Sequence, residues 1–284
     1  MSEYQYYEFL AVDRPLDDAQ QAEVRALSTR ARITATRFTN EYHWGDFRGD
    51  PRRLVERYFD AHLYLANWGT RRVMFRLPRS LPALDVAKGY CTGEHLTAWT
   101  YRDSLILDMT SEDETGEWDE DAEGALSAIV GARTELAGGD LRPLYLAWLS
   151  GYRTHDGDAV EYENELEPPV PPGLGSLSAP QRALAVFLRL DPDLLTVAAE
   201  ASPALPAAKD DASELADWVI ALPPKEKDDL LVRVVKDQTA QVRMELLRRF
   251  RGTPDLSDDD RRPRRTVAEL LNAATGIGSN PLDG

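Results

Sequence analysis

The sequence predicts an α+β fold, in which an open, mostly antiparallel sheet with helices is followed by an all-α C-terminal region. Short segments rich in aromatic and β-branched residues alternate with helix-like segments in the first third of the chain. Two pairs of these short segments are separated by tight turns, which is typical of antiparallel hairpins. After residue 125 the apolar residues recur at helical spacing. A ferredoxin-like arrangement is the candidate topology for the sheet.

The N-terminal part begins with the aromatic segment 4–12 (YQYYEFLAV), which predicts a strand. Asp17 or Asp18 can cap the helix that follows, because a carboxylate at that position accepts from the free N–H groups of the first turn. Segment 33–42 (ITATRFTNEY) then predicts a second strand. The dipeptide Asp50-Pro51 predicts the start of another helix, with the aspartate as cap and the proline as first helical residue.

Two hairpins complete the predicted sheet. Segments 63–66 and 73–77 alternate as half-buried strands do, and the turn Asn67-Trp68-Gly69-Thr70 joins them. Segment 85–90 predicts a short helix. Segments 95–101 and 104–109 predict the second hairpin.

The C-terminal part predicts short helices with recognisable starts. Ser178 with Pro180, and Asp191 with Pro192, are typical N-terminal signals. Apolar stripes over 215–222 and 230–235 predict two more helices, and Thr266 to Ala273 predicts another. These helices have no common repeat length, so a solenoid is not predicted.

These patterns divide the chain into four predicted parts. Residues 1–112 form the α+β domain. Residues 113–177 contain an acidic loop, two helices and a Pro-rich connector. Residues 178–275 form a small helical array, and residues 276–284 form a disordered tail.

The formal net charge of −16 is concentrated in the middle of the chain. Residues 81–170 hold 20 acidic and 5 basic residues, whereas residues 1–80 hold 13 arginines and 11 acidic residues. Bulk attraction to nucleic acid or to anionic lipid is therefore disfavoured for the protein as a whole. A local arginine-rich surface in the first third remains compatible with this distribution.

The sequence also predicts a cytoplasmic protein without a membrane segment. No run of roughly 18 or more apolar residues is present, as a transmembrane helix would require. The acidic N-terminus lacks the basic segment of a secretory signal. The single cysteine, Cys91, excludes an internal disulfide framework.

The hairpin tip is the predicted partner-binding site. Trp68 lies where a large apolar side chain is hard to bury, and Arg71 and Arg72 follow it directly. Arg48 and Arg52 lie in the preceding turn and helix. An exposed aromatic residue flanked by arginines is typical of an interface anchor. The alternative is that Trp68 folds back onto the sheet and the arginines pair with nearby aspartates.

Candidates for catalysis are weak. His43 lies in EYHWGD with Asp46 close by, and His62 follows 19 residues later. A histidine and a carboxylate can act as a general base or bind a metal. Their spacing matches no metal motif, and a loop histidine packed against Trp44 is the simpler interpretation. We predict no metal site and, because phosphate-binding glycine motifs are absent, no cofactor.

The function that these observations favour is a non-catalytic interaction module, an adaptor or subunit of a larger bacterial assembly that binds protein partners. The Pro-rich connector and the helical array are typical of proteins that present surfaces. One alternative is a hydrolase or metal-dependent enzyme using His43 and Asp46. A second is single-stranded nucleic-acid binding through the Arg/Trp hairpin, which the net charge disfavours.

Three motifs, YYEFLAVDRPL, FTNEYHWGDFRGDP and LANWGTRR, resemble a family of uncharacterised bacterial proteins. The resemblance extends over most of the chain and implies one shared fold across both parts. It carries no known activity and therefore no catalytic residues.

Overall fold

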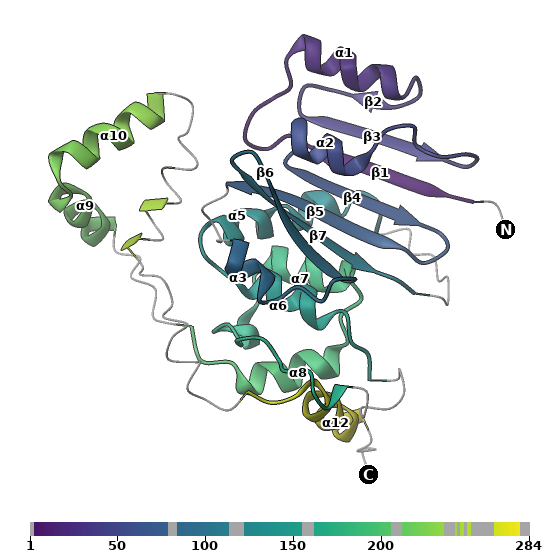
Figure 1. The fold of residues 1–284 in the computed structure, drawn as a ribbon, viewed down its shortest axis with the longest axis vertical. Coiled ribbons are helices and arrows are strands. Elements are labelled where there is room, and N and C mark those ends of the chain that lie inside the picture. The colour runs from purple at the N-terminus through teal and green to yellow at the C-terminus, as the bar shows by residue number, and fades with distance from the viewer. Residues whose placement is uncertain are drawn as a thin grey trace.

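The computed structural model describes residues 3–78, 84–113, 122–154, 162–205, 212–235, 242, 245–246, 249–250 and 264–278. Its seven strands are β1 (Gln5–Leu10), β2 (Arg32–Ile33), β3 (Arg37–Tyr42), β4 (Ala61–Ala66), β5 (Arg71–Pro78), β6 (Leu96–Tyr101) and β7 (Ser104–Ser111). They form one sheet in the order β2-β3-β1-β4-β5-β7-β6 (Figure 1). All neighbouring strands are antiparallel.

The described helices are α1 (Asp18–Leu27), α2 (Pro51–Arg57), α3 (Leu84–Lys88), α4 (Leu126–Ile129), α5 (Gly131–Ala137), α6 (Arg142–Leu149), α7 (Ala179–Phe187), α8 (Pro192–Ala201), α9 (Ala212–Ala221), α10 (Pro224–Val235) and α12 (Val267–Gly278). Most of them follow the sheet in the chain. The predicted α+β class, with an open antiparallel sheet and a helical C-terminal region, is confirmed.

The ferredoxin-like topology is wrong in its strand pairing. That arrangement is built from split βαβ units, whose crossover helices connect parallel strands. Here α1 lies between β1 and β3 in the chain, yet these two strands pair directly and antiparallel. β1 also pairs antiparallel with β4 on its other side.

Segment 33–42 is not one strand, as predicted, but a tight hairpin. Thr34 follows β2 directly, and its hydroxyl accepts from the backbone N–H groups of Thr36 and Arg37. The backbone N–H of Thr34 donates to the carbonyl of Arg37 at 2.8 Å. A threonine side chain that bonds to the following backbone is a local turn signal, and here it separates β2 from β3.

Side-chain caps begin several helices where the sequence predicts them. Asp17 caps α1 and forms a capping box with Gln20, and Asp50 caps α2. Ser178 caps α7 and Asp191 caps α8. In each case an oxygen accepts from a first-turn N–H group that has no partner inside the helix.

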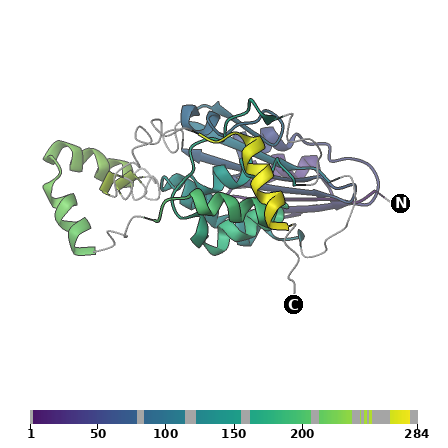
Figure 2. The same cartoon turned by 90° about the horizontal axis from the view of Figure 1, so that it is seen from below.

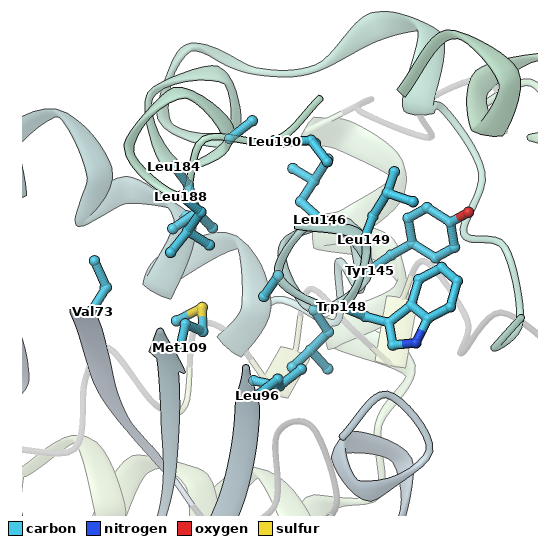
Figure 3. Close-up of a cluster of buried hydrophobic side chains, with 14 of the residues drawn as sticks. Val73, Leu96, Met109, Tyr145, Leu146, Trp148, Leu149, Leu184, Leu188 and Leu190 are labelled. Atoms are coloured by element: carbon cyan, nitrogen blue, oxygen red, sulfur yellow. The ribbon is translucent and has the colours of Figure 1, made fainter. Parts of the chain in front are cut away.

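The larger core lies between one face of the sheet and the helices of the C-terminal half (Figure 1). Alternate strand residues such as Val73 and Met109 contact this core. Figure 3 shows them facing Leu184 of α7 and Leu188 at its C-terminal end, with Trp148 of α6 in the same cluster. Sheet and helices therefore share one apolar interior, which continues across the predicted boundaries at residues 112 and 177.

The opposite face of the sheet is covered by α1 and α2. Phe9, Met74 and Ile106 from the strands pack there with Val24 of α1 and Val55 of α2. Both faces of the central strands are thus buried. This accounts for their nearly continuous apolar character, because a strand covered on one face only would alternate.

Figure 2 shows α9 and α10 standing apart from the rest of the protein, whereas α12 lies beside α8. The α9–α10 unit has a small apolar cluster of its own that includes Leu222, Leu230 and Val242.

Two predicted segments fall largely outside the described residues. The acidic loop is described only at its two ends, because 114–121 are not among the described residues. Of the predicted tail, residues 276–278 belong to α12, and 279–284 lie outside the described residues.

Candidate functional site

The tip of the β4–β5 hairpin presents Trp68 to solvent, with 47% of the side chain exposed. Gly69 beside it has a φ of +106°. A Cβ at this position would lie 1.7 Å from the carbonyl oxygen of Asp113, so only glycine fits. The carbonyl of Gly69 also accepts from Nη1 of Arg189 at 2.6 Å. The turn is therefore held against the body of the protein while its tryptophan remains accessible.

The two arginines after the turn are engaged within the protein and are not free at the surface as predicted, since Arg71 is buried and Arg72 is half-buried. Arg71 is only 5% exposed, donates to the carbonyl of Phe187 at 3.3 Å and lies over that residue's ring. Arg72 forms a two-pronged ion pair with Asp108, at 2.7 and 2.6 Å. Both guanidinium groups thus stabilise the fold, because one joins β5 to α7 and the other joins β5 to β7.

The two earlier arginines behave differently from each other. Arg52 in α2 places its guanidinium 4.0 Å from the ring centre of Trp99, which is a cation–π contact. The indole N–H of Trp99 in turn donates to Glu56 at 2.9 Å. Arg48 is exposed in the loop before α2. Of the four predicted arginines, Arg48 alone makes no hydrogen bond, ion pair or ring contact with the described residues.

The candidate catalytic residues do not share a buried site. His43 and Asp46 are exposed on the loop after β3. The centre of the His43 ring lies 5.0 Å from that of the Tyr4 ring in a tilted arrangement, and Asp46 accepts from the side chain of Gln5 at 3.1 Å. His62 is fully buried and lies 4.0 Å from the ring of Phe9. Among the described residues no cluster of three or more His, Cys, Asp or Glu side chains could hold a metal.

His62 is held as a neutral imidazole. Its Nδ1 lies 2.9 Å from the carbonyl oxygen of Glu8, which can only accept, so Nδ1 carries the proton. Nε2 is buried and has no hydrogen-bond partner among the described residues. Burial, together with the nearby charge of Arg72, lowers the pKa of His62 to about 3. A histidine in this environment packs in the core and does not transfer protons near neutral pH.

Three exposed apolar residues lie close together on α10, where the sequence predicted only one apolar stripe. Leu231, Val232 and Val235 are exposed by 63%, 51% and 83%. With Asp228 they occupy positions i, i+3, i+4 and i+7, which lie on one side of a helix. We call these four residues the outer face of α10. The opposite side carries Leu230, which is buried in the α9–α10 cluster.

A signal for this surface was present in the sequence. The pairs Leu230-Leu231 and Val234-Val235 put apolar residues at adjacent positions. Adjacent residues on a helix point about 100° apart, so both members of each pair cannot face one partner. A helix with two apolar sides needs two partners, and the described part of the chain supplies one.

A second feature that the sequence analysis missed is a polar groove of about 520 Å³ at the β2 edge of the sheet. It is lined by Tyr6, Arg32, Thr34, Arg37, Thr39, Glu41, Glu123 and Gly124, and we call it the β1–β3 groove. Its signal was the alternation Arg37, Thr39, Glu41, which places three polar side chains on one face of β3.

Comparisons with models of known families, with curated proteins and with solved structures find no match. The function must therefore be argued from the surfaces of the chain itself. Within the described ranges, no helix combines the length and the apolar character needed to cross a bilayer.

Proposed function

We propose that the protein is a non-catalytic interaction module, a cytoplasmic adaptor or subunit of a larger bacterial assembly, and that its partner is a protein. The observation that carries this proposal is the outer face of α10, on a helical unit that stands apart from the body (Figure 1). Trp68 is a second exposed apolar residue that can serve the same role.

Uncovered apolar surface on α10 supports this proposal. Burial of such surface is favourable by about 25 cal/mol per Å². On a compact body, scattered exposed apolar residues need no explanation. Here Leu231, Val232 and Val235 are contiguous on a protruding helix and leave a stripe that a partner can cover.

The surrounding charges favour a basic partner. Asp228 belongs to the outer face of α10 and Asp229 is adjacent to it in the chain, and both are exposed, as is Asp217 of α9. Lys227 uses its ammonium group to bond the carbonyl of Ile220 at 2.9 Å. An amphipathic helix with an apolar stripe and flanking Lys or Arg residues would complement this surface, in the manner of helix-to-helix recognition.

The test is affinity capture from the native host with matched variants. Wild-type protein is expected to retain a stoichiometric protein partner, and L231D/V235D is expected to lose it, because a charge in an apolar contact is desolvated without compensation. V186D is the control, since Val186 on α7 is 71% exposed but lies on another helix. Equal capture by all three proteins, or no partner with wild type, would overturn the proposal.

Folding of the variants must be checked independently. Because the substituted side chains are exposed, the far-ultraviolet circular dichroism and the thermal midpoint are expected to match those of the wild type. A loss of partner without a loss of fold identifies the outer face of α10 as the docking surface.

A further inference from the structure

The β1–β3 groove exists because the C-terminal helices cover only part of the sheet face. Leu63 and Leu65 of β4 are buried under these helices, and Glu8 and Tyr6 of β1 are buried beside them. On the same face, Arg37 and Thr39 of β3 are half-buried, and Arg32 of β2 is exposed. The covered sheet therefore ends in an open, polar depression of about 520 Å³, a size typical of small-ligand sites.

Strand register arranges the lining residues in rows. Tyr6 lies opposite Glu41, and Glu8 lies opposite Thr39. Arg32 lies opposite Thr39 on the other side. Arg37 and Glu41 are four residues apart on β3, so their Cα atoms are separated by about 14 Å along the strand. The groove thus has a cationic end at Arg37 and an anionic end at Glu41.

The cationic end is rigid. Nε of Arg37 donates to the buried carboxylate of Glu8 at 2.9 Å, and Nη2 donates to Ser127 at 3.1 Å. Tyr6 donates to the same carboxylate at 3.1 Å. Nη1 of Arg37 has no acceptor in the part of the chain that the structure describes. The guanidinium is therefore oriented by the protein and still has donors to offer.

Two further charged residues that line the groove have no partner among the described residues. Neither Arg32 nor Glu41 has a hydrogen bond or ion pair with any described residue. The hydroxyl of Thr39, between them in the sheet, is likewise without a partner among the described side chains. Glu123 lies at the Glu41 end, where it accepts from the hydroxyl of Tyr4 at 2.7 Å.

We propose that the β1–β3 groove binds a short peptide with free ends, whose carboxylate lies between Arg32 and Arg37 and whose ammonium group lies against Glu41 and Glu123. A purely anionic ligand is disfavoured because Glu41 and Glu123 would repel it. A purely cationic ligand is disfavoured by Arg32, which no described carboxylate neutralises, whereas the charge of Arg37 is balanced by Glu8. Guanidinium and carboxylate groups recognise these two ends by charge-assisted hydrogen bonds.

The spacing selects the length of the ligand. Arg32 is level with Thr39 of β3, so a point midway between Arg32 and Arg37 lies three residues from Glu41 along that strand. This separation is about 10 Å. An extended tripeptide spans the same distance, since a chain covers at most about 3.3–3.6 Å per residue. A single amino acid is too short to reach both ends. This site is separate from the outer face of α10 and does not depend on the proposed function.

The test uses trialanine with free ends, its N-acetyl and C-amide forms, and free alanine, with binding measured by NMR titration. Trialanine is expected to bind, and blocking either end is expected to weaken binding about fivefold, the upper range for one exposed ion pair. Alanine is expected not to bind at the same concentrations. These comparisons use only the wild-type protein and do not depend on the folding of a variant.

Variants then assign the ends. R32Q is expected to weaken the binding of trialanine about fivefold and to leave the binding of the C-amide form unchanged. E41Q is expected to weaken the binding of trialanine by the same factor and to leave the binding of the N-acetyl form unchanged. R30Q, at an exposed arginine outside the groove, is the control. The proposal is overturned if trialanine shows no saturable binding, if alanine binds as well, or if R32Q weakens all probes equally.

Discussion

At the scale of single residues, the turn at Trp68 depends on the glycine that follows it. Gly69→Ala would combine a backbone φ of +106° with a Cβ only 1.7 Å from the Asp113 carbonyl oxygen. We expect the variant to lose at least about 3 kcal/mol of unfolding free energy, because backbone strain and a clash with rigid backbone add together. Chemical denaturation measures the loss.

Gly45 provides the matched control for that substitution. It also has a positive φ, +76°, but a Cβ there meets nothing within 4 Å. Gly45→Ala should therefore cost only the left-handed backbone strain, about 1 kcal/mol. Equal losses in the two variants would show that the Asp113 segment moves aside at little cost.

Trp68 itself is expected to contribute to binding and not to stability. Its side chain is half exposed, so Trp68→Ala should change the unfolding free energy by no more than about 1 kcal/mol while weakening partner capture. Thermal unfolding and affinity capture measure the two effects. If the variant unfolds, Trp68 belongs to the core and the predicted anchor is wrong.

His62 makes stability depend on pH. Its pKa in the folded protein is lowered to about 3, below the ordinary value of 6.5, so between these values the unfolded chain binds a proton that the folded protein does not. The contribution of His62 to the unfolding free energy is therefore fully present above pH 6.5 and is lost as the pH falls toward 3. The expected slope is about 1.4 kcal/mol per pH unit.

His62→Leu isolates this contribution from that of the carboxylates. Both proteins share the other titrating groups, so the difference between their unfolding free energies should change with pH by the slope of one proton. Urea denaturation at a series of pH values between 6 and 4 gives the two curves. Parallel curves would mean that His62 accepts a proton in the folded state.

At the scale of elements, local signals were sufficient for most of the secondary structure. Asp17, Asp50, Ser178 and Asp191 cap helices because their oxygens bond N–H groups within the same turn, and such contacts are visible in sequence. The β2–β3 turn was missed because Thr34 provides its acceptor through a side chain that is also common in strands.

The candidate site was less predictable, because distant parts of the chain determine exposure. Arg71 is buried by Phe187, which is 116 positions away, and no local pattern indicates that contact. Trp68 was predicted correctly as exposed because a tight turn projects its tip residues, which is a local property. The Arg37-Thr39-Glu41 alternation was visible, but only the sheet order shows that helices leave it open.

The buried carboxylate of Glu167 connects the segment before α12 to the rest of the protein. Glu167 accepts from Nη2 of Arg265 at 2.9 Å and from the hydroxyl of Tyr145. Its backbone N–H donates to the carbonyl of Arg265 at 3.1 Å. These three bonds join Arg265, before α12, to Tyr145 of α6 and to the segment that contains Glu167.

We expect Glu167→Gln to cost about 3 kcal/mol of unfolding free energy, because it keeps the shape but leaves a mostly buried guanidinium without its charge partner. Amide exchange in α12 should also accelerate. The control is Glu163→Gln, at an exposed residue of the same segment. Unchanged stability in both variants would show that α12 is held by its apolar residues, such as Val267 and Leu270, without the ion pair.

At the scale of the whole molecule, the strand order could not be derived from sequence. β1 is the first strand in the chain but lies third in the sheet, between β3 and β4. Its two antiparallel neighbours bury it in the middle of a sheet whose faces are covered by α1 and α2 on one side and by the later helices on the other. Local periodicity identifies a strand and does not specify its neighbours.

The shared core leads to a prediction about the fragment 1–113. Within the whole protein, Leu63, Val73, Phe75 and Leu107 are fully buried on the face that the C-terminal helices cover. Without those helices this face would expose a contiguous apolar surface, which isolated domains rarely tolerate. We expect the fragment to aggregate or to lack fixed packing, with poor dispersion in its NMR spectrum, and co-expression with residues 114–284 to restore it. A monomeric fragment with a well-dispersed spectrum would instead establish residues 1–112 as an independent domain, because the α1 and α2 side of the sheet would then suffice to stabilise it.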